Sequence, residues 1–155
     1  YHRVFQNRRD GIMGNTTDLT RLVLDTNVLV AALRSASGAA NQLLAQVGAR
    51  RFVPCVSSRI LLEYESALRR PDLVPLSFSQ VDSFLDAFLA RSLQCDVHFS
   101  LRPTLSDPGD EHVLELAVAA QALAIVTYNV RHFLEARRFG MNVLNPAQVL
   151  KVLGG

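Results

Sequence analysis

The stretch Leu22-Val23-Leu24-Asp25-Thr26-Asn27-Val28-Leu29-Val30 decides the fold class. It opens on a continuous apolar run, which is typical of a parallel strand buried on both faces. Asp25 then stands where that strand leaves the sheet, and in open α/β sheets ligands collect at the carboxyl ends of the strands. A carboxylate at a buried edge needs a cation, a proton or hydrogen-bond donors. Asp25 is therefore either a functional acid or the N-cap of the next helix, and the stretch alone favours neither.

Strand and helix patterns alternate along the rest of the chain. We expect strands at 21–25, 51–56, 93–97, 124–127 and 141–144, the second being brief or at the sheet edge because it contains Pro54. We expect helices at 27–33, 38–48, 57–69, 77–91, 108–122 and 146–152, with a short helix or loop at 130–138. The alternation predicts an α/β fold, a three-layer α/β/α sandwich with a central, mostly parallel sheet. Periodicity does not give the strand order.

The length of 155 residues indicates one domain with a sizeable core. No apolar run reaches the roughly 20 residues of a membrane span, and no signal peptide is visible, so we expect a cytoplasmic protein that makes no membrane contact. Residues 1–20 are polar and aperiodic, and we expect a disordered or expression-derived leader there, followed by a single domain at 21–155. Cys55 and Cys95 have no metal-ligand spacing and are expected to be buried free thiols.

The charge of the chain is only weakly informative about its partners. A net charge of +2 is too small to indicate a nucleic-acid binder. The basic residues are nearly all arginine, with Lys151 the only lysine, and arginine suits bidentate recognition of phosphate. Arg131 is a weak candidate for such a contact, and an ordinary surface position is an equal alternative.

A second acidic motif comes before the Ala- and Leu-rich segment at 112–120. Asp107, Asp110 and Glu111 are three acids within five positions, and Pro108 follows the first of them. Asp107 suits an N-cap, Pro108 the first helical position and Asp110 the capping-box position. The functional alternative is that Asp110, Glu111 or both project into a site shared with Asp25.

Two further motifs carry polar groups that could join such a site. Glu63 and Glu65 fall on opposite borders of the apolar face of their helix, and periodicity does not choose between them. Thr127 and Asn129 follow an apolar run in the same way that Asp25 and Asn27 follow the first one. Two strands that both end in hydrogen-bonding residues suggest one polar pocket at the carboxyl edge of the sheet.

Acids gathered from several elements repel one another and so need a cation. Oxygen ligands select Mg²⁺ or Mn²⁺ over zinc, and such sites activate water and neutralise charge on a phosphodiester. His112 and His132 lie near the acids in sequence, but we expect both to be solvated or hydrogen-bonded rather than metal ligands.

The motifs at 23–29, 61–64, 107–111 and 126–129 come in an order that resembles a PIN domain, in particular the VapC-like toxin of toxin–antitoxin pairs. The resemblance runs from about residue 22 to 150. It implies a Rossmann-like α/β/α sandwich and a Mg²⁺- or Mn²⁺-dependent ribonuclease that leaves a 3′-hydroxyl and a 5′-phosphate. It also implies an RNA substrate, a small antitoxin partner and a homodimer.

Carried onto this chain, the resemblance implies three catalytic and metal-binding acids, Asp25, Glu63 and Asp110. Glu111 is the alternative third acid, because the motif can be registered one residue either way. The fourth family position is commonly Asp, whereas this chain has Asn129, an amide that can ligate a metal but adds no negative charge. Supporting polar residues would be Thr26, Asn27, Asp107 and Thr127.

Two other functions compete with the ribonuclease. Asp25 could be a phosphorylated nucleophile, but haloacid-dehalogenase-like enzymes require an acid two residues later, where Asn27 stands. A receiver-like phosphoacceptor would require a late lysine, and none precedes Lys151. A weakened PIN-like domain that binds RNA or a protein without cutting is the stronger competitor, because Asn129 removes one charge from the site.

Overall fold

A computed structural model describes residues 19–100, 105 and 107–154, so the predicted leader lies outside the described residues except for its last two positions. In this part of the chain, five parallel strands form one sheet in the order β3-β2-β1-β4-β5. They are β1 (Thr20–Leu24), β2 (Phe52–Val56), β3 (Leu93–Gln94), β4 (Ala124–Val126) and β5 (Asn142–Leu144). Strand β1 thus begins at the last residue of the predicted leader.

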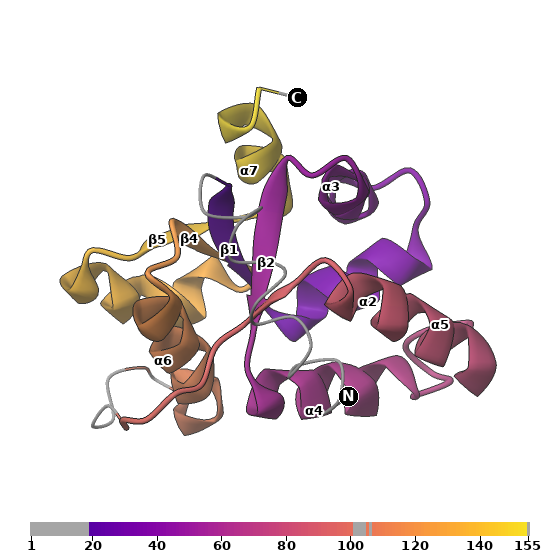
Figure 1. Cartoon of the computed structure of the whole chain (residues 1–155), viewed down its shortest axis with the longest axis horizontal. Coiled ribbons are helices and arrows are strands. Elements are labelled where there is room, and N and C mark those ends of the chain that lie inside the picture. The colour runs from indigo at the N-terminus through magenta and orange to yellow at the C-terminus, as the bar shows by residue number, and fades with distance from the viewer. Residues whose placement is uncertain (1–18, 101–104, 106, 155) are drawn as a thin grey trace.

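Helices connect the strands and cover both faces of the sheet (Figure 1). Helix α6 packs on β1, β2 and β4, and α3 packs on β2 and against α7. The three-layer α/β/α prediction is therefore confirmed. The helical elements are α2 (Thr26–Arg34), α3 (Ala39–Gly48), α4 (Ser58–Leu68), α5 (Phe78–Leu89), η1 (Pro108–Asp110), α6 (Glu111–Ala120), η2 (Val130–Phe139) and α7 (Pro146–Val152), where η1 and η2 are 3₁₀ segments.

The strand order reverses beside β1. The chain builds outward from β1 through β2 to β3, and then returns through α6 to β4 on the other side of β1. The carboxyl ends of β1 and β4 therefore flank a topological switch point, where open α/β sheets form a ligand crevice. Leu24 is paired in register with Val126, so the next residues, Asp25 and Thr127, emerge side by side.

One strand prediction needs correction. The third strand was predicted over 93–97 but ends at Gln94, because Gln94 pairs with Val56, the last residue of β2. Beyond it, the Cys95 amide still donates to the Val56 carbonyl. The second strand, predicted to be brief or at the edge, is brief and lies between β1 and β3. Pro54 is tolerated there because β3 pairs only with the two residues that follow it.

The helix predicted over 108–122 begins as the 3₁₀ turn η1 and continues as α6 only to Ala120. It ends because Gln121 adopts a left-handed conformation with φ 52°. The other predicted elements are present within one or two residues of their expected bounds. Among the described residues, no helix is both long and apolar enough to cross a membrane.

Candidate functional site

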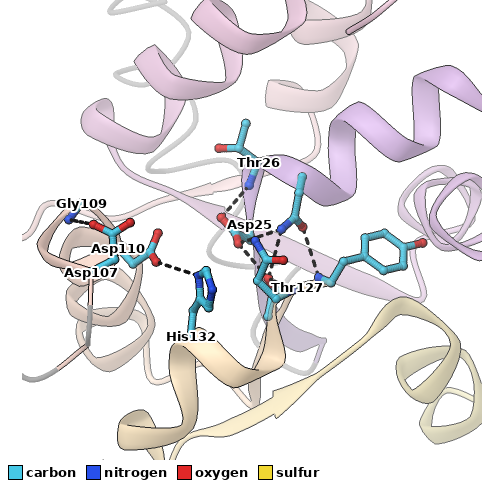
Figure 2. A network of polar contacts seen from close by, with 10 residues as sticks. Asp25, Thr26, Asp107, Gly109, Asp110, Thr127 and His132 are labelled. Carbon is cyan, nitrogen blue, oxygen red and sulfur yellow. Dashed lines mark hydrogen bonds and ion pairs between the residues drawn. The ribbon is translucent and has the colours of Figure 1, made fainter.

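Asp25 is held at the carboxyl end of β1 by a network of donors. Its side chain is the N-cap of α2, with Oδ1 accepting from the Thr26 amide at 2.9 Å. Its Oδ2 accepts from the Thr127 hydroxyl at 2.8 Å and from the Asn27 side-chain amide at 3.3 Å (Figure 2). Asp25 is only 8% exposed. The capping interpretation is therefore confirmed, and the same carboxylate is buried at the switch point.

Residues at the end of β4 complete this network. The Thr127 hydroxyl also accepts from the Asn129 backbone amide at 3.0 Å, and the Asn27 side-chain oxygen accepts from the Tyr128 amide at 3.2 Å. Thr127 is fully buried. These bonds tie the first turn of α2 to the loop after β4, so the polar residues at the ends of the two strands lie together as predicted.

Burial decides the acidity of Asp25. Loss of solvent raises the pKa of its carboxyl above the ordinary value, while the bonds from Thr127 and the Thr26 amide act in the opposite direction. The Glu63 carboxylate adds a smaller repulsion that also raises the pKa. Asp25 is therefore a desolvated acid whose ionised form a nearby cation would stabilise.

Glu63 comes to the site from the middle of α4. Its Oε2 accepts from the Thr26 hydroxyl at 3.4 Å, and its Oε1 lies 2.9 Å from Nε2 of His112 on α6. The Glu63 side chain is 43% exposed, whereas His112 is buried. Glu65, the alternative, instead forms an ion pair with Arg69 at 3.5 Å along α4. The geometry therefore favours Glu63 as the acid that faces Asp25.

Asp110 lies on the other side of the site, at the end of η1. Its Oδ2 is 3.9 Å from Nδ1 of His132 on η2 (Figure 2). Burial and the charges of Asp25, Asp107 and Glu63 raise the pKa of Asp110 to about 6, and His132 acts in the opposite direction. Burial is the largest cause of this elevation, and repulsion from the neighbouring carboxylates adds to it.

The neighbours of Asp110 have structural partners. Asp107 is the N-cap of η1, where its Oδ1 accepts from the Gly109 amide at 2.8 Å, as the capping interpretation predicted. Oε1 of Glu111 accepts from the Leu105 amide at 2.6 Å. Glu111 is thereby engaged with the preceding segment, which favours Asp110 as the third acid.

Asn129 and Arg131 lie at the start of η2. Both are exposed, and the Asn129 side chain does not cap the helical segment that follows it. The exposure of Arg131 agrees equally with a surface position and with a phosphate contact.

The donor set suits a hard divalent cation, since it consists of carboxylates that repel one another at the crevice. Among residues 19–100, 105 and 107–154, however, no three acid, imidazole or thiol groups are close enough to form a ready-made metal site. The acids are thus gathered at one edge without being drawn tightly together.

His112 was expected to be solvated or hydrogen-bonded, and its Nε2 lies 2.9 Å from the Glu63 carboxylate. Its burial, at 6% exposed, was not predicted. Helical spacing offered one signal, because His112 shares the buried face of α6 with Leu116, four residues later. Cys55 and Cys95 are free thiols as expected, the first buried and the second half-buried.

Comparisons with known proteins agree with this fold. The family model described as PIN domain matches residues 21–131. Among solved structures, the chain is similar to a chain of VapBC2 from Rickettsia felis bound to a DNA fragment from their promoter, with a TM-score of 0.56 and 21% sequence identity. That match covers 81% of this chain and 98% of the other. No curated protein matches this sequence.

Proposed function

Because this chain belongs to the PIN-domain family, we propose that it is a metal-dependent endoribonuclease and the toxin of a toxin–antitoxin pair. The observation that carries the proposal is the gathering of Asp25, Glu63 and Asp110 from three separate elements at the switch point. Burial and the charges of Asp25, Asp107 and Glu63 raise the pKa of Asp110 to about 6, and a divalent cation would stabilise its ionised form.

In this proposal, Asp25, Glu63 and Asp110 hold Mg²⁺ or Mn²⁺, with Glu111 and Asn129 as secondary ligands. When bound, the ion would supply activation of water and neutralisation of phosphodiester charge. The donors from Thr127 and Thr26 keep the Asp25 carboxylate oriented before anything binds. Asn27 and Asp107 support the same edge through the turns that they hold.

The RNA strand would approach across the exposed start of η2. Arg131 is exposed there, next to His132 in sequence, and in this proposal its guanidinium binds a phosphate oxygen.

The test is cleavage of RNA with added Mg²⁺ or Mn²⁺ by wild type and by Asp25→Asn. Asparagine is as good an N-cap as aspartate, so this variant keeps the start of α2 while removing the charge. Circular dichroism checks that the fold is retained. Cleavage should be lost in the variant, and equal cleavage by both proteins would rule out the assignment.

The alternative, an RNA- or protein-binding domain that does not cut, follows from Asn129. A calorimetric titration separates the two functions, because a non-cutting domain need not bind Mn²⁺ even at millimolar concentration. Asn129→Asp is the matched variant. Restoring a fourth carboxylate should tighten Mn²⁺ binding if the site takes the ion, and an unchanged titration would favour the non-cutting domain.

The proposed partner is a small antitoxin that lays a helix over the acidic edge. Leu62, directly before Glu63, is 66% exposed and offers an apolar contact there. The structurally similar Rickettsia felis chain comes from a complex of VapBC2 with promoter DNA. Co-expression with the product of a short neighbouring reading frame should suppress cleavage, and a homodimer of the toxin is checked by light scattering.

A further inference from the structure

A pocket of ≈ 410 Å³ opens beside the acidic site. Its walls are the start of α4, the segment 95–100 that follows β3, and the first two turns of α6. Figure 1 shows the chain running past α6 after it leaves β3. The volume lies within the range of small-molecule sites, roughly 300–1,000 Å³, and accommodates one nucleobase. The three acids Asp25, Glu63 and Asp110 are not among the residues that line this pocket.

His112 joins the pocket to the acids. Its Nε2 lies 2.9 Å from Glu63, and the same side chain lines the pocket. It is 6% exposed, and its Nδ1 has no hydrogen-bond partner within the described part of the chain. A buried polar atom without a partner is costly, and this one belongs to a side chain that lines the pocket.

The other lining groups match the chemistry of a base. Phe99 is 41% exposed and offers a ring face, and aromatic side chains are the usual platform for unpaired RNA bases. Arg59 can donate to O6 and N7 of guanine, while the carboxylates of Asp96 and Glu115 can accept from its amino group. Arg59 also lies one turn before Glu63 on α4, so a base held here is adjacent to the acids.

We infer that this pocket binds one unpaired nucleobase of the RNA, with guanine the best match, next to the phosphodiester that is cut. The inference rests on the proposed ribonuclease function for its substrate. It extends that function, because the acids alone carry no preference among RNA sequences.

The first experiment measures binding without metal, by amide chemical shifts of the protein in EDTA. Guanosine monophosphate is the probe, and ribose 5-phosphate is the control that lacks a base. Perturbations centred on Arg59, Phe99 and His112 with the nucleotide alone are expected. Equal perturbations by both compounds, or none at the pocket with millimolar nucleotide, would overturn the inference.

The second experiment compares Phe99→Ala with Phe78→Ala, which removes an exposed ring from α5, outside the pocket. Affinity for a short single-stranded RNA with one guanine, measured by fluorescence anisotropy in EDTA, should fall about tenfold in Phe99→Ala only. Equal affinities of the two variants would contradict the inference.

Cleavage assays separate failure of this inference from failure of the proposed function. Wild type that cuts RNA without preference, and whose cleavage pattern is unchanged in Phe99→Ala, would disprove the base pocket and leave the nuclease intact. Base binding in EDTA together with equal cleavage by wild type and Asp25→Asn would disprove the nuclease alone. Occupation of the pocket by a protein partner instead would appear as absent nucleotide binding, which counts against the inference.

Discussion

The two halves of the acidic site differ in how much of their charge the protein itself satisfies. On the β1 and β4 side, Asp25 is buried and accepts three hydrogen bonds, from Thr26, Asn27 and Thr127. On the η1 side, Oδ2 of Asp110 lies 3.9 Å from Nδ1 of His132, and the pKa of Asp110 is raised to about 6. Figure 2 shows the two halves as separate networks.

The difference indicates a division of labour. Asp25 serves the fold as well as the site, because it caps α2 and links two strand ends. Asp110 contributes little to the fold, and its ionised form is disfavoured until a cation arrives. Substitutions on the two sides should therefore separate stability from activity.

The largest expected effect is the slower RNA cleavage of the Asp110→Asn variant. Removing one of three ligand charges should slow RNA cleavage at least about hundredfold, since metal-assisted stabilisation is worth several kcal/mol. The free energy of unfolding without metal should not fall, because the variant also removes a repelled charge. Cleavage rates and urea unfolding in EDTA measure the two quantities.

Asp86→Asn is the matched control for that change, as Asp86 is an exposed acid on α5, away from the site. It should cut RNA at the wild-type rate. A large loss of unfolding free energy in Asp110→Asn would show that Asp110 stabilises the fold, as Asp25 does, and would contradict the proposed difference between the two sides.

The second effect is a lower free energy of unfolding in the Thr127→Val variant. Valine keeps the shape of this buried threonine but removes the hydroxyl that donates to Asp25. A hydrogen bond to a charged group is worth about 1.5–3 kcal/mol, so the free energy of unfolding should fall by about that amount in urea. Thr20→Val, in β1 but outside the network, should change it little. Similar losses in both variants would refute a special role for the β4 hydroxyl.

The sequence predicted one part of the site and not another. Asp25 and Thr127 were predicted to share an edge because parallel strands end together, and the pairing of Leu24 with Val126 confirms it. The contact between Glu63 and His112 depends on how α4 crosses α6, which no local pattern encodes. Likewise, the length of β3 depends on where its partner β2 ends, not on the apolar residues of 93–97 themselves.

The third expected effect is a pH dependence. The pKa of Asp110 is about 6 in the folded protein and 3.8 as the ordinary value, so the folded state binds its proton more tightly. Its contribution to stability is therefore present below pH 3.8 and is lost as the pH rises through 6. Without metal, the gain in unfolding free energy of Asp110→Asn over wild type should shrink as the pH falls from 7 to 4.5. Urea titrations of both proteins across that range measure it, and a pH-independent difference would mean that folding does not raise the pKa of Asp110.

The smallest expected effect is that of Glu65, the acid of α4 that lies outside the site. Glu65 pairs with Arg69 on the surface of α4, so Glu65→Gln should change the free energy of unfolding by no more than about 0.5 kcal/mol and leave cleavage unchanged. Glu63 contacts Thr26 on the satisfied side and His112 beside the pocket, so Glu63→Gln should slow cleavage strongly. Parallel assays of the two variants decide which acid of α4 belongs to the site. Since the two glutamates are only two residues apart, unequal cleavage cannot come from helix propensity and must reflect the side of α4 that faces Asp25.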